Sequence, residues 1–235
     1  MKILYIFPHP DDESFGPSPV MHQQLKQGHE VHLLTLTLGG ATAERHKLNL
    51  SIEEMGKVRL AEMLKVKQVL QPTTWTMWEL EDGGLTKMNP IILEDMVLKL
   101  ILSIEPNIIV TYPQHGISGH FDHLTIHSVT KRLFCQLKDL QTGPKRLAFF
   151  TLPENKNGTG NAHTKHTPDE DIDCVIPLHD DDLQSLHDTL YCYESYMDVI
   201  QNYRVIEQLG NSISFEIWDE NHKPFLTDLT DKIDN

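Results

Sequence analysis

The sequence predicts an α/β fold, a Rossmann-like and mostly parallel sheet with helices on both faces. Short β-rich runs alternate with helical segments along the chain, and parallel strands need a crossover that is usually a helix. The chain has 235 residues and a hydrophobic fraction of 39%, which suits one domain with a substantial core. We therefore expect a single domain over 1–235, with its site at the carboxyl ends of the strands.

The first half of the chain begins as a βαβ unit. Its expected elements are strands at 2–8 and 30–38, helices at 20–28, 51–66 and 90–105, and a turn-rich segment at 75–85. Ser51 followed by acids is typical of a helix N-terminus, and the helix that Pro90 starts should stop at Pro106. Trp75 and Trp78 are interpreted as packing residues.

The second half continues the alternation. Its expected elements are strands at 107–113, 146–153 and 212–219 and helices at 120–137 and 180–209. Residues 154–171 are rich in Asn, Gly, Thr and charge and are expected to form a flexible loop, in which His163 and His166 are not a metal site. The stretch 168–182 contains seven acids, which is typical of a solvated face.

Charge and cysteine content narrow the function classes. Lys and Arg total 20 against 34 Asp and Glu, a formal charge of -14, which disfavours nucleic acid and anionic membranes as partners. Cys135, Cys174 and Cys192 fit neither a disulfide framework nor a CxxC motif. The N-terminus lacks the pattern of a signal peptide, and no apolar run approaches a membrane span. We expect a soluble cytoplasmic protein.

Two clusters of His and Asp follow two of the expected strands. His-Pro-Asp-Asp-Glu occupies 9–13, directly after the strand at 2–8. Gly-His-Phe-Asp-His occupies 119–123, after the strand at 107–113. In a doubly wound sheet the strand order reverses between the first strand and the strand that opens the second half, and ligands bind there. The fold therefore predicts that the two clusters meet.

The residue types indicate a divalent cation. A dinucleotide site would need GxGxxG, which is absent, and three consecutive acids would repel a pyrophosphate. Imidazole and carboxylate are standard zinc ligands, and catalytic sites use three of them with water as the fourth. His9, Asp12 and His123 fit that set. Asp11 should stay uncoordinated and act as the general base toward the bound water.

Neighbouring residues of the second cluster suggest supporting roles. His120 lies one helical turn before His123 and is a candidate to stabilise an oxyanion or protonate a leaving amine. Asp122 could orient a neighbouring histidine. His127 is interpreted as a packed or surface histidine, because the four-coordinate site is already full.

Two other functions are compatible with the same donors. Two histidines and one carboxylate also form the facial triad of non-haem iron enzymes, so iron is an alternative to zinc. A protein that binds metal or sugar without turnover is the second alternative.

These motifs resemble those of the LmbE-like (PIG-L) zinc-dependent N-deacetylases, which include the deacetylases of mycothiol and bacillithiol biosynthesis. The likeness rests on HPDDE at 9–13 and on His-X-Asp-His at 120–123, and it covers about residues 1–135. Phe7-Pro8 before the first motif is most similar to the bacillithiol-type branch.

The resemblance implies the roles argued above and adds the substrate. It implies an N-acetylglucosamine-type amide as substrate, and sugar contacts from Arg59, Glu62 and Asp82. The plain alternatives are a solvated ion pair between Arg59 and Glu62 and a turn-forming role for Asp82. The partner is then a small N-acetylated amino-sugar conjugate. The oligomeric state stays open, with a homo-oligomer as one outcome.

Three positions depart from the family pattern. Phe121 stands where the second motif commonly has proline, and Ser118 stands where a tyrosine is often found. Gly40 replaces a glutamate that commonly follows Leu-Gly after the second strand. The departures leave the expected metal ligands intact and affect the expected contacts to substrate.

Overall fold

One seven-stranded sheet organises the chain, in the order β3-β2-β1-β4-β5-β7-β6. The computed structural model describes residues 1–141, 143–154 and 164–233. The strands are β1 (Lys2–Phe7), β2 (Glu30–Thr37), β3 (Thr74–Leu80), β4 (Ile108–Thr111), β5 (Arg146–Thr151), β6 (Cys174–Pro177) and β7 (Ser212–Ile217). The first five are parallel, whereas β7 runs antiparallel to β5 and to β6. The mostly parallel α/β sheet expected from the sequence is confirmed.

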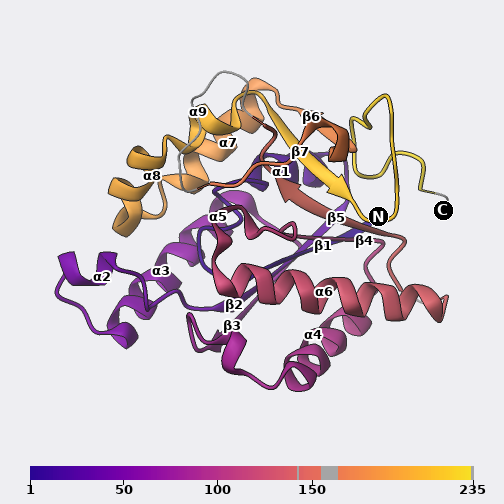
Figure 1. Ribbon diagram of the computed structural model, residues 1–235. Helices are drawn as coiled ribbons and strands as arrows, with labels where there is room; N and C mark the ends of the chain where they lie inside the picture. The colour runs from indigo at the N-terminus through magenta and orange to yellow at the C-terminus, as the bar shows by residue number, and fades with distance from the viewer. Residues whose placement is uncertain (142, 155–163, 234–235) are drawn as a thin grey trace.

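Helices cover both faces of this sheet (Figure 1). They are α1 (Ser18–Lys26), α2 (Glu44–Lys47), α3 (Ile52–Leu70), α4 (Pro90–Ile104), α5 (Gly116–Gly119), α6 (Phe121–Asp139), α7 (Asp180–Leu190), α8 (Met197–Tyr203) and α9 (Val205–Leu209). Single 3₁₀ turns are η1 (Leu85–Lys87), η2 (Asp169–Asp171) and η3 (Glu194–Tyr196).

The alternation of side chains along β1 builds two core layers. Tyr5 and Phe7 face a layer that contains residues of α1, α3 and α7. Leu4 and Ile6 face the opposite layer, which is filled from α4 and α6. All four side chains are buried, because β1 lies in the middle of the sheet with helices on either side.

Local signals set the helix boundaries where the sequence predicted them. The Ser51 hydroxyl accepts the Glu54 N–H and the Glu54 carboxylate accepts the Ser51 N–H, a capping box that starts α3. Pro90 occupies the first turn of α4 behind the Asn89 cap. That helix ends at Ile104, and its C-cap Glu105 takes a left-handed conformation before Pro106.

The expectation of a turn-rich segment at 75–85 is wrong for its first part, which is strand β3. Trp75 is buried, and its indole N–H donates to the Thr35 hydroxyl on β2 at 3.0 Å. The turn residues Asp82, Gly83 and Gly84 follow the strand. The strand is fixed by pairing with β2, a non-local contact that turn signals nearby in the sequence obscured. Trp75 and Trp78 both pack against the core, as expected.

The expected helix at 180–209 is also wrong, since it is divided into α7, η3, α8 and α9. Arg204 has a φ of 49°, a left-handed residue that separates α8 from α9. The acidic stretch 168–182 is only partly a solvated face, because it contains the antiparallel strand β6. Asp173 within it is buried and accepts the backbone N–H groups of Ile217 and His222.

Part of the expected flexible loop 154–171 lies outside the described residues, namely 155–163, and His163 with it. Its remaining residues include η2 and Thr167, which bridges to Pro153. Among the residues that the structure describes, no helix is both long enough and apolar enough to span a bilayer.

Candidate active site

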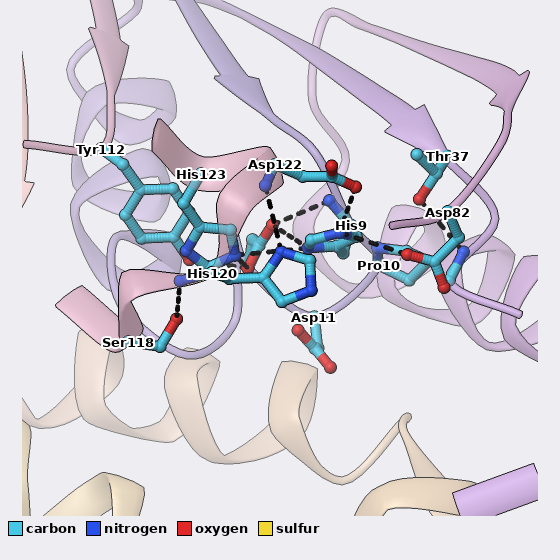
Figure 2. A network of polar contacts seen from close by, with 12 residues as sticks. His9, Pro10, Asp11, Thr37, Asp82, Tyr112, Ser118, His120, Asp122 and His123 are labelled. Atoms are coloured by element: carbon cyan, nitrogen blue, oxygen red, sulfur yellow. Dashed lines mark hydrogen bonds and ion pairs between the residues drawn. The ribbon is translucent and has the colours of Figure 1, made fainter. Parts of the chain in front are cut away.

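The two His/Asp clusters meet where the strand order reverses. β1 lies between β2 and β4, so the loop after β1 and the loop after β4 open on the same edge of the sheet. His9 Nδ1 lies 3.3 Å from His123 Nε2, although 114 residues separate them in the sequence. Figure 2 shows His9, His120 and His123 gathered at this edge. The predicted juxtaposition is confirmed.

His9, Asp12 and His123 have the spacing of a tetrahedral donor set. Asp12 Oδ2 lies 3.6 Å from His9 Nδ1, and Asp12 Oδ1 lies 3.5 Å from His123 Nε2. Tetrahedral zinc with bonds of about 2.0–2.1 Å separates its donors by about 3.4 Å. The two histidine nitrogens each lie near this spacing from one oxygen of the Asp12 carboxylate, so the three side chains are candidates to share one ion. His9 and His123 also form a possible metal-holding group with His120.

The ring of His123 is oriented by the backbone of the loop before α6. His123 Nδ1 donates to the Gly116 carbonyl oxygen at 2.9 Å, which leaves the Nε2 lone pair facing His9 and Asp12. Gly116 has a φ of 63°, and a Cβ at this position would lie 2.9 Å from the His123 Cβ. Only glycine meets both demands, so this residue sets the approach of the ligand loop.

Two carboxylates orient His9 in the same way. His9 Nε2 lies 3.2 Å from Asp122 Oδ2 and 3.2 Å from Asp82 Oδ1, so its N–H points to them and Nδ1 faces His123. Asp122 is fully buried and accepts the backbone N–H groups of Gly83 and Leu85. Its fixed position supports the orienting role expected from the sequence, although His9 rather than a neighbour in its own loop is the partner.

Tyr112 is a site residue that the sequence interpretation missed. Its hydroxyl donates to Asp12 Oδ1 at 2.6 Å, and its ring stacks on His123 with centroids 4.0 Å apart and planes 6° apart. It lies directly after β4, at the end of the strand that leads to the second cluster. A polar aromatic at the carboxyl end of a switch-point strand was the available signal.

The electrostatics of the three candidate ligands favour a cation. Burial alone would lower the pKa of His9. The carboxylates of Asp12, Asp122 and Asp82 have the larger combined effect and raise that pKa well above its usual value. Burial lowers the pKa of His123 to about 4, so its ring is neutral and free to donate a lone pair. Burial raises the pKa of Asp12, but His123 and His9 more than offset it and lower that pKa to about 2.

Asp11 is not one of the three candidate ligands, but it lies near them. Its φ of 83° is a left-handed conformation, which Asp tolerates better than most residues. In Figure 2 it is drawn apart from the dashed network around His9. It lines the same cavity as His9 and Asp12. Burial raises the pKa of Asp11 to about 6, against the opposing charge of Arg59.

The solvated ion pair of Arg59 and Glu62, the alternative to a sugar contact, is contradicted. Both side chains are buried and have other partners. Arg59 Nη2 donates to Asp11 Oδ2 at 2.6 Å and to the Pro10 carbonyl, beneath the Tyr196 ring at 3.7 Å. Glu62 accepts the backbone N–H and the hydroxyl of Ser195. Arg59 thus fixes the position of the Asp11 carboxylate, and Glu62 links α3 to η3 through Ser195.

Asp82 and His120 line the cavity from opposite loops. Asp82 accepts the Ala41 N–H at 2.7 Å in addition to its contact with His9. His120 is the N-cap of α6, where its Nδ1 accepts the Asp122 N–H at 3.2 Å. The hydrogen of the neutral ring is therefore on Nε2, which can donate to a bound molecule. Burial and His9 lower the pKa of His120.

Other titratable residues stay outside the site. His127 is buried and its Nδ1 donates to the Tyr112 carbonyl oxygen, which confirms the packed histidine expected from the sequence. His22, Asp181 and Asp182 form another group close enough for a metal, where Lys26 and Gln23 already contact the carboxylates.

Gly40 has a steric reason for replacing the commoner glutamate. A Cβ at this position would lie 2.2 Å from the Ile52 carbonyl oxygen at the start of α3. We expect Gly40→Ala to lower the free energy of unfolding by roughly 1–3 kcal/mol, because the backbone of α3 must shift. Thermal unfolding measures this, and an unchanged midpoint would contradict it.

Of the other two departures from the family pattern, Ser118 lines the cavity and Phe121 is 70% exposed.

Relatives in sequence match just over half to about two thirds of the chain. The chain is 27% identical over 154 residues to 1D-myo-inositol 2-acetamido-2-deoxy-alpha-D-glucopyranoside deacetylase of Thermomonospora curvata, covering 56% of this chain and 51% of the relative. The Salinispora arenicola protein of the same name is 24% identical over 184 residues, covering 69% and 59%. The chain thus spans just over half the length of these relatives. The likeness to the bacillithiol-type branch stays a prediction.

Solved structures share the whole fold. A deacetylase of the teicoplanin biosynthesis pathway superposes with a TM-score of 0.71 at 13% identity, covering 92% of this chain and 97% of that one. N,N'-diacetylchitobiose deacetylase from Pyrococcus horikoshii gives 0.65 at 16% identity, covering 92% and 83%. GalB, a hydratase from Pseudomonas putida, gives 0.60 at 12% identity, covering 94% and 97%. At such identities the likeness establishes the fold alone.

The family model PIG-L, described as GlcNAc-PI de-N-acetylase, matches residues 4–134. That span runs from β1 into α6 and contains both His/Asp clusters together with Arg59, Asp82 and Tyr112. The family likeness and the observed geometry therefore concern the same residues. The chain belongs to the PIG-L family.

Proposed function

We propose that the chain is a zinc-dependent hydrolase that removes the acetyl group from an N-acetylglucosamine-type conjugate. The observation that carries this proposal is the convergence of His9, Asp12 and His123 within 3.3–3.6 Å of one another, in a cavity that the carboxylate of Asp11 also lines. The sequence relatives are named as deacetylases of an acetamido sugar. They lend no support to the iron enzyme or the non-catalytic binding protein that the donor set leaves open.

His9, Asp12 and His123 would hold the metal. Zinc bound by three such ligands lowers the pKa of a water toward about 7 and polarises a carbonyl group. The protein contributes fixed ligands, since Gly116, Asp122 and Tyr112 orient them through hydrogen bonds.

Asp11 acts as the general base in this proposal. Its carboxylate lines the cavity next to the donor set and takes the proton from the attacking water. Arg59 Nη2 donates to the Asp11 carboxylate at 2.6 Å. Its positive charge lowers the pKa of Asp11 and so opposes the effect of burial. Arg59 is therefore a positioning residue for Asp11, in addition to the sugar contact that the family resemblance implies.

His120 acts on the other side of the amide. Its Nε2–H can donate to the carbonyl oxygen as negative charge develops there. The proton that Asp11 takes from the water is then available for the departing amine. Asp82 lines the same cavity, where its carboxylate can accept a sugar hydroxyl in addition to its contacts with His9 and Ala41. The substrate is a small amino-sugar conjugate, and no residue role here requires nucleic acid or a membrane.

Acetate release tests the proposal. The protein is stripped with a chelator, reloaded with one equivalent of zinc or iron(II), and assayed against a panel of N-acetylglucosaminides with and without oxygen. We expect acetate only from metal-loaded protein, with zinc and independently of oxygen. Fully loaded protein that releases no acetate from any member would overturn the proposed function.

The hydroxyl of Tyr112 is expected to strengthen zinc binding. Tyr112→Phe removes the hydrogen bond to Asp12 and keeps the ring stacked on His123. We expect zinc affinity to fall about 10- to 100-fold, the usual loss for a residue that orients a metal ligand. Competition with a chromogenic chelator measures it. Tyr5→Phe is the matched control, since its hydroxyl bonds Gln24 in the core; equal losses in both variants would contradict the assigned role.

A further inference from the structure

The loop between β4 and α6 approaches the candidate metal site in a strained conformation. Ile117 has a φ of 57° and a ψ of -64°. A β-branched residue is an outlier at positive φ, and this pair of angles is close to the rare and strained γ-turn. Such a conformation persists only where the surrounding structure fixes it. Contacts from outside the loop are therefore needed to hold Ile117 in place.

The peptide group between Gly116 and Ile117 links two histidine rings. Its carbonyl oxygen, that of Gly116, accepts the Nδ1–H of the candidate ligand His123 at 2.9 Å. Its N–H, that of Ile117, donates to Nδ1 of His115 at 3.1 Å. The peptide group is planar, so its carbonyl and its N–H turn together. The ring of His115 therefore helps to hold the carbonyl that orients His123.

A buried hydroxyl holds the other side of the His115 ring. Because Nδ1 is an acceptor and burial lowers the pKa of His115 to about 4, the ring is neutral with its hydrogen on Nε2. That N–H donates to Thr167 Oγ1 at 3.1 Å, and the Thr167 hydroxyl donates to Glu216 Oε1 at 2.6 Å. Thr151 Oγ1 lies 2.5 Å from Thr167 Oγ1 and donates to its second lone pair. The one hydrogen and both lone pairs of this hydroxyl are thus used.

The segment 164–167 also contacts the strained residue directly. The Lys165 N–H donates to the Ile117 carbonyl oxygen at 2.7 Å. Thr167 is 2% exposed, and its own N–H donates to the Leu152 carbonyl oxygen at 2.8 Å. The segment is therefore fixed to the chain after β5 and holds the loop at two points.

We propose that three residues act together as positioning residues for the candidate ligand His123, namely Glu216, Thr167 and His115. They hold the Gly116 carbonyl where it keeps the Nε2 lone pair of His123 turned toward the other candidate ligands. The inference rests on the metal-binding role of His123 in the proposed function. Thr167 and Glu216 lie beyond residue 134, where the match to the family model ends, so elements outside that match support a ligand inside it.

Two substitutions at Thr167 test the proposal. Thr167→Val keeps the shape and removes the hydroxyl, whereas Thr167→Ser keeps the hydroxyl. In the metal-free protein, the ring-nitrogen chemical shifts of isotope-labelled histidine report which nitrogen of His123 carries the hydrogen. We expect Nδ1–H alone in the wild type and in Thr167→Ser, and a mixture of both forms in Thr167→Val.

Zinc affinity is the second measurement, by competition with a chromogenic chelator. We expect Thr167→Val to bind zinc about tenfold more weakly, the lower end of the usual loss for a residue that orients a metal ligand, because Thr167 acts through His115. Thr167→Ser should stay within about threefold of the wild type, since its hydroxyl can make the same bonds. Equal losses in the two variants would show that the hydroxyl is not the cause and would overturn the inference.

Thr189→Val is the matched control. Thr189 is fully buried, its hydroxyl donates to the Leu186 carbonyl oxygen and contacts Ser18 Oγ, and it is not among the residues that line the cavity. We expect it to lower the unfolding midpoint as much as Thr167→Val does, because each variant loses one bonded buried hydroxyl, and to leave the His123 ring and zinc affinity unchanged.

A second pair of variants at His115 covers the case in which Thr167→Val does not fold, because His115 is only half-buried. His115→Leu removes both bonds of the ring. His115→Asn keeps an acceptor for the Ile117 N–H, a bond that asparagine commonly makes to the residue two positions ahead. We expect the leucine variant to show the mixed His123 ring and the weaker zinc binding, and the asparagine variant to recover part of both.

The inference and the proposed function can fail separately. An unchanged His123 ring and unchanged zinc affinity in His115→Leu and in folded Thr167→Val would overturn the inference and leave the deacetylase intact. Losses of the same size in Thr189→Val would also overturn it. A His123 ring that changes only in the Thr167→Val and His115→Leu variants, with no acetate released by zinc-loaded wild type, would support the inference and overturn the proposed function.

Discussion

Asp11→Asn is expected to reduce acetate release about 10²- to 10⁴-fold, the usual contribution of a general base. The amide cannot take the proton from the attacking water, whereas asparagine tolerates the left-handed backbone at this position as well as aspartate does. The candidate zinc ligands are untouched. We therefore expect zinc stoichiometry to stay at the wild-type value, as measured by elemental analysis beside the rate assay.

The Asp11→Asn substitution also removes a charged partner of Arg59, so stability must be followed separately from activity. The guanidinium is buried and retains its bond to the Pro10 carbonyl and its contact with Tyr196. Loss of one charged partner in a buried pair is destabilising, and we expect a lower unfolding midpoint with a folded, zinc-loaded protein at the assay temperature. Near-normal turnover by this variant would remove Asp11 from the mechanism.

His123→Gln is expected to abolish stable zinc binding and, with it, turnover. Glutamine can still donate to the Gly116 carbonyl oxygen but has no imidazole nitrogen to place near His9 and Asp12. Loss of a direct ligand should exceed the 10- to 100-fold loss expected for an orienting residue, so we expect an affinity at least about 100-fold weaker. Equilibrium dialysis against zinc measures it directly.

His127→Gln is the matched control on the same helix. His127 is also buried in α6 and also donates through Nδ1 to a backbone carbonyl oxygen, that of Tyr112, but it lies outside the donor set. We expect it to bind zinc within about threefold of wild type while losing comparable stability. Equal loss of zinc in both variants would mean that the effect comes from the helix and that His123 is not a ligand.

The fold could be predicted because its signals are local and repeated. The apolar run of β1, the capping box at Ser51 and the proline limits of α4 each report on a few neighbouring residues. β3 and β6 were missed because each depends on a neighbouring strand that is distant in the sequence. The division of 180–209 was missed because residues such as Arg204 take a left-handed conformation without a glycine to announce it.

The sequence by itself determined which residue types follow β1 and β4, and the handedness of parallel crossovers then placed them on one edge of the sheet. It therefore supplied His9, Asp11, Asp12, His120 and His123 as candidates. Only the tertiary structure decided how they are oriented and what surrounds them. The hydrogen bond from Tyr112 to Asp12 and the hydrogen bond from Arg59 to Asp11 both join residues far apart in the chain. Such contacts arise from packing in three dimensions, which no spacing along the chain encodes.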